Sequence, residues 1–205
     1  MFSIEDIVED LNDLDLAILQ LLHAGNNAPL KGKVAFQKEM FLIADYIDEI
    51  REQAEFIPHT FGPYSEVVEK GMRNLKSLRL VEEKYHEYHI TPNGVAALGK
   101  AKSAFTDEQV EAIQDFKEFL NDLSRDEILL FSYISYPDFI EKSAIYERVI
   151  RKRIPTSISL YKKEKVSLEK AAFLAGLTVE KFLDQLQQLK NPIRFQGVVQ
   201  NNCNG

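Results

Sequence analysis

The stretch from Leu160 to Leu189 constrains the fold most, because it contains two helix starts and one helix stop. Ser167 can cap a helix that begins at the next residue, since its hydroxyl accepts a hydrogen bond from an unpaired N–H of the first turn. Gly176 is expected to end that helix in the left-handed conformation, which costs glycine least. Thr178 can then cap a second helix, whose apolar face carries Val179, Phe182, Leu183 and Leu186. Two helices joined by a short turn with glycine predict a helix-turn-helix, a unit that places its second helix in the major groove of DNA.

The same spacing fits an ordinary helical hairpin that serves only packing. Small side chains at Ala171, Ala172 and Ala175 would let two such helices approach closely. Spacing alone leaves both interpretations open.

The charge distribution favours nucleic acid as a partner. Residues 1–103 carry 11 Lys and Arg against 17 Asp and Glu, residues 104–150 carry 4 against 11, and residues 151–205 carry 10 against 4. The last segment is therefore +6 in a chain of net charge −7, and phosphate binding depends on local cation density. The cations that precede the two helices could hold the DNA backbone: Arg151, Lys152, Arg153, Lys162, Lys163 and Lys165. Glu180 and Asp184 argue against this, because they lie on the exposed side of the second helix and would repel phosphates.

Residues 1–103 show the order of a winged helix-turn-helix, in which three helices precede a β-hairpin. Helices are expected at 14–22, where Gly25 ends the first, at about 33–53, and after the Gly62-Pro63 break, where Ser65 or Tyr64 opens the third. Two alternating strands at 80–85 and 87–91 predict the hairpin, and a last helix follows from Val95 to Ser103. The polar face of the third helix carries Lys70, Arg73, Asn74 and Ser77. A small α+β domain that does not bind DNA is the alternative.

Residues 104–150 predict a helical connector. Thr106 with Gln109 and Ser124 with Glu127 form two capping-box patterns, and each marks a helix start. Such helices could mediate dimerisation or could be buried against the first domain. The expected fold is thus mainly α, with a winged helix-turn-helix at 1–103, the connector at 104–150, a basic helix-turn-helix at 151–195 and a flexible tail at 196–205.

Two family resemblances support this division. Residues about 14–102 resemble the YwgA-like and Panacea-related winged-helix proteins of bacteria and archaea, through the Phe61–Ser65 junction, the Leu-rich segment 75–80 and the closing segment 88–94. Residues about 154–195 resemble an uncharacterised small prokaryotic family often encoded like antitoxins, through the matching run from Leu160-Tyr161-Lys162 to Leu183. The resemblances imply a regulator or an antitoxin-type protein. Panacea-type domains are also thought to bind toxins directly, which would make the acidic half a protein-binding surface.

Other chemistry finds little support in the sequence. Cys203 is the single cysteine, so internal disulfides are excluded and a reducing cytoplasm fits. No run of 18 apolar residues predicts a membrane span, and the acidic start is unlike a secretory signal. His86 and His89 lack further ligands for a metal, and there is no phosphate-binding loop or nucleophile elbow. We therefore expect no enzyme, no metal and no cofactor.

The sequence predicts a cytoplasmic, dimeric, DNA-binding transcriptional regulator. In the C-terminal unit, bases or flanking phosphates would be met by Thr178, Lys181, Gln185 and Gln188, and the DNA backbone by Arg151, Arg153, Lys162, Lys163 and Lys165. A second contact set comprises Lys70, Arg73 and Ser77 of the third helix, with Tyr88 and His89 of the wing. The alternative is a protein-interaction module whose acidic half neutralises a basic partner such as a toxin.

Overall fold

The structure is a computed structural model that describes residues 3–190. Over that range the chain forms twelve α-helices, one short 3-10 helix and two separate two-stranded antiparallel sheets. The mainly α class predicted from the sequence is therefore confirmed. The predicted tail at 196–205, including Cys203, lies outside the described residues, as do residues 191–195 of the predicted C-terminal domain.

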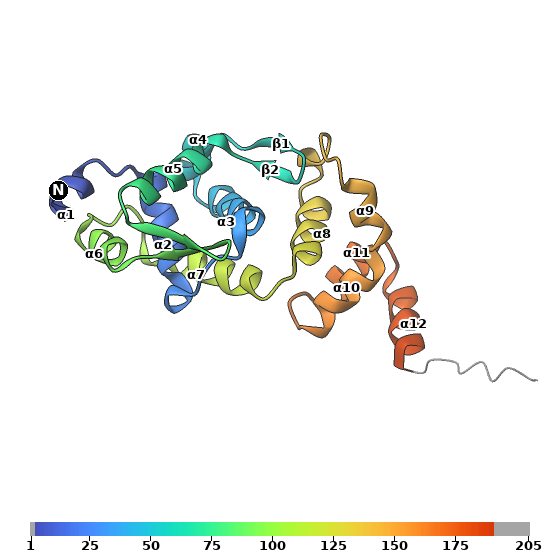
Figure 1. The fold of residues 1–205 in the computed structure, drawn as a ribbon. Helices are drawn as coiled ribbons and strands as arrows, with labels where there is room; N and C mark the ends of the chain where they lie inside the picture. Colours follow the sequence, from blue (N-terminus) through green and yellow to red (C-terminus); the bar gives the residue numbers. More distant parts are fainter. Residues whose placement is uncertain (1–2, 191–205) are drawn as a thin grey trace, which may run out of the picture.

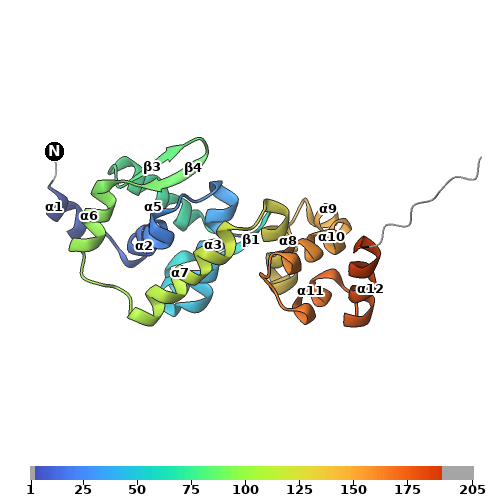
Figure 2. The same cartoon turned by 90° about the horizontal axis from the view of Figure 1, so that it is seen from below.

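Two groups of elements lie side by side along the molecule (Figures 1 and 2). The first group, which we call the N-terminal lobe, consists of α1 (Ile4–Glu9), α2 (Asp13–Asn27), α3 (Gly32–Tyr46), α4 (Asp48–Ala54), β1 (Ile57–His59), β2 (Gly62–Tyr64), α5 (Glu66–Ser77), β3 (Val81–Lys84), β4 (Glu87–Ile90), α6 (Pro92–Lys100) and α7 (Asp107–Asn121). The second group, the C-terminal lobe, consists of α8 (Arg125–Ser135), η1 (Pro137–Phe139), α9 (Tyr146–Arg151), α10 (Arg153–Lys162), α11 (Leu168–Ala175) and α12 (Val179–Lys190).

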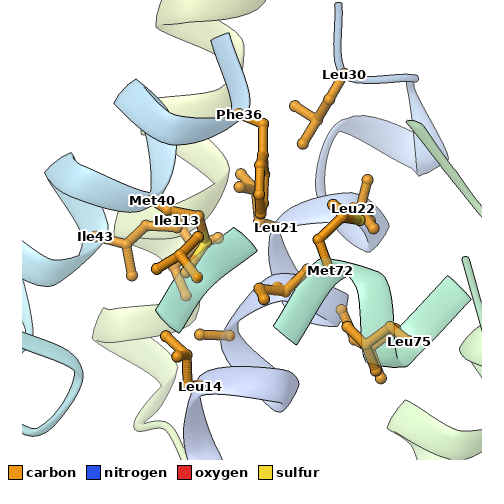
Figure 3. Packing of buried hydrophobic residues seen from close by; sticks show 14 of the residues in the cluster. Leu14, Leu21, Leu22, Leu30, Phe36, Met40, Ile43, Met72, Leu75 and Ile113 are labelled. Atoms are coloured by element: carbon orange, nitrogen blue, oxygen red, sulfur yellow. The ribbon is translucent and has the colours of Figure 1, made fainter. Parts of the chain in front are cut away.

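Helix α2 is the centre of the N-terminal lobe. Leucines and an isoleucine make this helix apolar on nearly every side, and its fully buried residues include Ile18, Leu19, Leu21 and Leu22. Helices α3, α5 and α7 supply facing side chains such as Phe36, Met72 and Ile113, which surround Leu21 and Leu22 (Figure 3). A helix that is hydrophobic all round has to be covered by other elements, and α2 is covered in this way.

The predicted third helix and the hairpin after it are both present. Ser65 caps α5, because its Oγ accepts a hydrogen bond from the Val68 N–H at 2.9 Å. Strands β3 and β4 are joined by Tyr85 and His86, both with positive φ, as a tight two-residue hairpin turn requires. Leu30, between α2 and α3, forms an isolated antiparallel bridge with Tyr88 of β4. The hairpin is thereby fixed to the helical core.

The structure corrects the sequence interpretation between residues 33 and 65. The single helix predicted over 33–53 is two helices, since the chain leaves the helical conformation at Ile47, whose φ is −111° and ψ 108°. The segment predicted only as a break forms the hairpin β1–β2, in which Ile57 pairs with Tyr64 and Gly62 has a φ of +82°. Helix α1 was not expected, and α6 begins at Pro92 rather than at Val95. The break at Ile47 and the hairpin β1–β2 lengthen the connection between the second and third predicted helices.

Both predicted capping boxes of residues 104–150 are present, with Thr106 and Gln109 at the start of α7 and Ser124 and Glu127 at the start of α8. Helix α7 packs against α2 and α3 in the N-terminal lobe, whereas α8 packs against α9 and α10 of the C-terminal lobe and also against α3 and β2 of the N-terminal lobe. The segment is therefore divided between the two lobes. No helix within residues 3–190 is long and apolar enough to cross a membrane.

Candidate nucleic-acid interface

The local geometry of α11 and α12 is the one that the sequence predicts. Ser167 Oγ accepts a hydrogen bond from the Lys170 N–H at 3.2 Å, and Thr178 Oγ1 accepts one from the Lys181 N–H at 3.3 Å. Gly176 has a φ of +69° and ends α11 in the left-handed conformation. Phe182 of α12 is fully buried against the alanines of α11 and the ring of Tyr161. The two helices are thus capped, sharply turned and held together by one aromatic anchor.

The outer side of α12 carries mixed charge. Thr178, Lys181 and Gln188 are exposed, while Gln185 is half-buried with its Nε2 3.5 Å from Gln188 Oε1. Glu180 and Asp184 are exposed on the same helix. The helix presents polar groups that could contact base edges, but the cations for the DNA backbone have to come from neighbouring elements.

Arg153 contacts α11 rather than solvent alone. Its Nε donates to the Leu174 carbonyl at 2.9 Å, and one terminal nitrogen donates to the Phe173 carbonyl at 3.2 Å. A cation at this position satisfies the last carbonyls of α11 and interacts favourably with the helix dipole. A Cβ at Gly176 would lie 2.5 Å from the Arg153 guanidinium carbon, so the turn and the arginine fit each other. Arg153, predicted to hold phosphate, caps a helix in this structure.

Two further predicted phosphate ligands form ion pairs with the α7–α8 junction. Lys163 Nζ lies 2.8 Å from Glu127 Oε2, and Lys165 Nζ lies 2.6 Å from Asp122 Oδ2. Burial raises the pKa of Glu127, but hydrogen bonds from Lys163 and from the Ser124 N–H outweigh it and hold that pKa below its usual value. The basic C-terminal segment and the acidic segment before it therefore neutralise one another within the chain.

Arg151 and Lys162 are different. Both are exposed, and neither forms an ion pair with any residue in 3–190. Lys162, Lys165 and Ser167 line one shallow hollow at the start of α11. The structure thus places two of the lysines predicted to contact the DNA backbone at the start of α11.

The second predicted contact set lies on α5 and the β3–β4 hairpin. Lys70 is exposed, Arg73 forms an exposed ion pair with Glu66 at 3.0 Å, and Ser77 donates to the Asn74 carbonyl at 2.7 Å. His89 is partly exposed, with Nε2 3.9 Å from a carboxylate oxygen of Glu87. These residues share a surface, but their charges are partly balanced by neighbouring carboxylates.

Tyr88 does not belong to this surface. Its side chain is only 7% exposed, its ring packs edge-on against Phe36 at 5.7 Å, and burial raises its pKa to about 12. The alternation of β4 places Tyr88 on the core face. The residue predicted as a wing contact is therefore part of the hydrophobic core, while Tyr85 at the hairpin tip is 97% exposed.

The sequence interpretation missed one group of cations. A groove of about 590 Å³ lies between the start of α3 and the α7–α8 junction, and its walls include Lys31, Lys33, Arg125 and Lys163. Arg125 is exposed and lies over the Phe61 ring at 4.9 Å. Lys31 and Lys33 lie about 90 positions before Arg125 and about 130 before Lys163, so only the three-dimensional fold could have shown that they meet.

Within residues 3–190, no group of three or more His, Cys, Asp or Glu side chains is arranged to hold a metal ion. Helix α12 and the neighbouring lysines and arginines offer hydrogen-bond donors, acceptors and positive charge, which are the groups that contact nucleic acid. We found no protein-family model, no curated protein and no solved structure that matches this chain.

Proposed function

We propose that the protein is a DNA-binding transcriptional regulator whose C-terminal helix pair reads DNA. The observation that carries the proposal is the geometry of α11 and α12: both helices are capped, Gly176 makes the turn, and the polar side of α12 remains exposed. A second helix that follows a short glycine turn and keeps its polar side exposed is the element that enters the major groove in helix-turn-helix proteins.

The structure reduces the set of contacts proposed for this unit. Among the described residues, Lys181 remains free to face bases or phosphates, and Arg151 and Lys162 remain free to hold the backbone. Thr178 and Gln188 are exposed, but the Thr178 hydroxyl caps α12 and the Gln188 amide oxygen accepts from Gln185. Arg153, Lys163 and Lys165 are committed to contacts within the chain. A phosphate would have to replace those contacts, at a cost that includes leaving the buried Glu127 carboxylate without its cation.

We propose further that the N-terminal lobe is a winged helix-turn-helix. Helices α2, α3 and α5 precede the hairpin β3–β4 in the required order, and the Leu30 bridge to Tyr88 adds a third strand position beside the hairpin. The insertion of α4 and β1–β2 between the second and third helices departs from the simple pattern. Lys70, Arg73 and Ser77 of α5 then form a second DNA-facing surface.

The test is binding of the purified full chain to its own upstream DNA, with salt titrated from low to physiological concentration. In the C-terminal unit we expect the double change Lys162→Glu and Lys181→Glu to lower the slope of log affinity against log salt, by about 1 for each lost phosphate contact. The matched variant on α5 is Lys70→Glu with Arg73→Glu. Lys102→Glu is the charge control, because Lys102 is exposed in the connection between α6 and α7 and belongs to neither candidate helix.

The outcomes separate the proposals. A slope lost only in the C-terminal variant supports reading by α12, and a slope lost only in the α5 variant supports the winged unit instead. Binding no tighter than to random DNA at any salt concentration would show that the protein is not a sequence-specific regulator, and the acidic half would next be tested for a basic protein partner.

A further inference from the structure

A cavity of about 390 Å³ lies beside the hairpin β1–β2, against one side of α3. Its size is at the lower end of the range of roughly 300 to 1,000 Å³ that small-molecule sites occupy. The lining residues from α3 include Lys33, Val34, Gln37 and Lys38, and those from the hairpin include His59, Phe61, Gly62, Pro63 and Tyr64. Glu66 at the start of α5 completes the lining, so the cavity is walled by three elements of the same lobe and one of them contributes a carboxylate.

Lys38 is the unusual residue of this cavity. Its side chain is 98% buried, and within residues 3–190 its Nζ donates a single hydrogen bond, to the Pro63 carbonyl at 2.7 Å, and forms no ion pair. An ammonium group has three N–H donors, and a buried cation without a counter-charge is costly. Burial accordingly lowers the pKa of Lys38 to about 7. The cavity therefore contains a cationic group that would gain from an anion.

Several other polar groups of the wall already have hydrogen-bond or ion-pair partners. The side-chain amide of Gln37 accepts from the Ser65 N–H at 2.9 Å and donates to the Ser65 carbonyl at 3.1 Å. The Tyr64 hydroxyl donates to Glu66 at 2.9 Å, and Lys33 pairs with Glu69 at 3.0 Å. An occupant would therefore find one buried donor group with unused N–H bonds, Lys38, with the exposed Lys33 and His59 at the same wall.

The remaining surface suits a flat apolar body. Val34, Phe61 and Pro63 supply apolar walls, and the rings of His59 and Tyr64 lie 4.7 Å apart with 33° between their planes. A Cβ at Gly62 would lie 2.9 Å from the Tyr133 ring and 3.6 Å from Lys38 Nζ, so the glycine allows Tyr133 to approach closely on that side. Aromatic walls around one convergent polar group are typical of small-molecule sites.

We propose that this cavity binds a small organic anion with an aromatic body, whose anionic group takes the free donors of Lys38 Nζ. The anion stabilises the charged form of the amine, so its affinity falls as the pH rises above neutral. The other titratable groups around the cavity are Lys33, Glu66 and Glu69, Tyr64 and His59 of the hairpin, and Tyr133 of α8 beneath Gly62. His59 is the histidine of this wall, so the pH profile is also measured in His59→Gln.

The experiment is an NMR titration of the ¹⁵N-labelled full chain with benzoate, indole-3-acetate and phenyl phosphate, and with benzamide as the uncharged match of benzoate. We expect saturable shifts of the Gly62 and Tyr64 amides with at least one anion, and binding of benzamide weaker by about tenfold or more. Lys38→Met keeps the length of the side chain and is expected to abolish the preference for the anion. Val34→Phe, which narrows the cavity from α3 and leaves Lys38 in place, is expected to weaken anion and amide alike.

The proposal is overturned if none of the three anions gives saturable shifts, if the shifts map to another surface, or if the preference survives in Lys38→Met. If Lys38→Met does not fold, the pH profile decides, since an affinity that is flat between pH 7 and 9 in His59→Gln contradicts a role for the amine. None of these measurements requires DNA, so the result is independent of the proposed regulator function.

Discussion

The two candidate reading helices, α5 and α12, differ in what neutralises the cations around them. On α5, Arg73 pairs with Glu66 on the same exposed surface, with side chains 55% and 54% exposed. In the C-terminal lobe, Lys163 at the end of α10 pairs with Glu127 of α8, and the carboxylate is only 3% exposed. An exposed ion pair is worth about 0 to 1 kcal/mol and exchanges easily for a phosphate, whereas a pair with one buried partner supports the fold.

This difference shows that a count of charges along a sequence does not tell how many of those charges are available to a partner. The segment 151–205 is basic, yet several of its cations complement the acidic segment before it. The acidic N-terminal lobe, in contrast, presents Lys70 and Arg73 on an accessible surface. The basic unit keeps Arg151 and Lys162 exposed as well, so the excess of cations in its sequence overstates how many are available, and variants of the two units can test this contrast.

The largest expected effect concerns the glycines that shape each unit. At Gly94, beside the β3–β4 hairpin, a Cβ would lie 2.2 Å from the Leu80 carbonyl oxygen, and backbone cannot move aside as a side chain can. We expect Gly94→Ala to lower the free energy of unfolding by about 3 kcal/mol. At Gly176 the clash is with the flexible end of Arg153, so Gly176→Ala should cost about 1 to 2 kcal/mol, mainly for its left-handed φ.

Urea denaturation followed by circular dichroism measures both values. Gly99→Ala is the control, because nothing lies within 4 Å of its Cβ position in α6, and we expect it to be neutral or to stabilise by about 0.5 to 1 kcal/mol. Equal costs for Gly94→Ala and Gly176→Ala would show that the Arg153 side chain does not move aside for the added Cβ.

The second prediction breaks one ion pair in each unit. Lys163→Met leaves the buried Glu127 carboxylate without its cation and should lower the free energy of unfolding by about 2 kcal/mol at neutral pH. Arg73→Met removes an exposed pair of similar length and should cost less than about 1 kcal/mol. Similar losses in the two variants would remove the distinction between the units.

The same pair predicts a dependence on pH. The pKa of Glu127 is lowered in the folded state, so its stabilising contribution is complete above the usual glutamate value of 4.5 and is lost as the pH falls through the folded pKa. The stability difference between the natural protein and Lys163→Met is therefore expected to shrink in acid. A difference that stayed constant down to unfolding would mean that Lys163 acts through packing alone.

The third prediction concerns the buried amine of α3, with an exposed lysine of the same helix for comparison. The pKa of Lys38 is lowered by burial from its usual 10.5 to about 7, so the unfolded chain binds this proton more tightly. Between pH 7 and 9, stability should therefore rise with pH in the natural protein relative to Lys38→Met, by about 1 to 2 kcal/mol. The pH dependence of unfolding in urea measures this, and Lys33→Met, whose lysine is half-exposed, should show no such change relative to the natural protein.

Elements whose signals are local could be predicted from the sequence. The capping residues Thr106, Ser124, Ser167 and Thr178 and the stop at Gly176 each act within one turn of a helix, and the structure confirms them. The break at Ile47 and the hairpin β1–β2 could not be predicted in this way. The hairpin depends on contacts with distant residues, such as the bond from Ser143 Oγ to the Thr60 carbonyl at 3.1 Å.

The candidate site was less predictable than the fold, because exposure and pairing are properties of the folded chain. Lys162 and Lys163 are adjacent residues of the same type. Among the described residues Lys162 forms no ion pair, whereas Lys163 pairs with Glu127. Tyr88 and Tyr85 lie on the same hairpin, but one is in the core and the other at the tip. Nothing in the local pattern of charges separates the members of the lysine pair.

The smallest expected effect decides which helix reads DNA, and it rests on the proposed function. Glu66→Gln on α5 frees Arg73, whereas Glu180→Gln on α12 removes a carboxylate that would face phosphates. Both positions are exposed, so each change should alter the free energy of unfolding by less than about 0.5 kcal/mol. Removing one repulsive charge should tighten DNA binding severalfold at low salt, but only on the helix that lies against the DNA.

Glu49→Gln, on the exposed side of α4, is the matched control. Tighter binding by Glu66→Gln alone would assign reading to the winged unit although its lobe is acidic, and tighter binding by Glu180→Gln alone would assign it to α12. An equal gain in all three variants would mean that only the net charge of the protein matters and that neither helix reads the sequence.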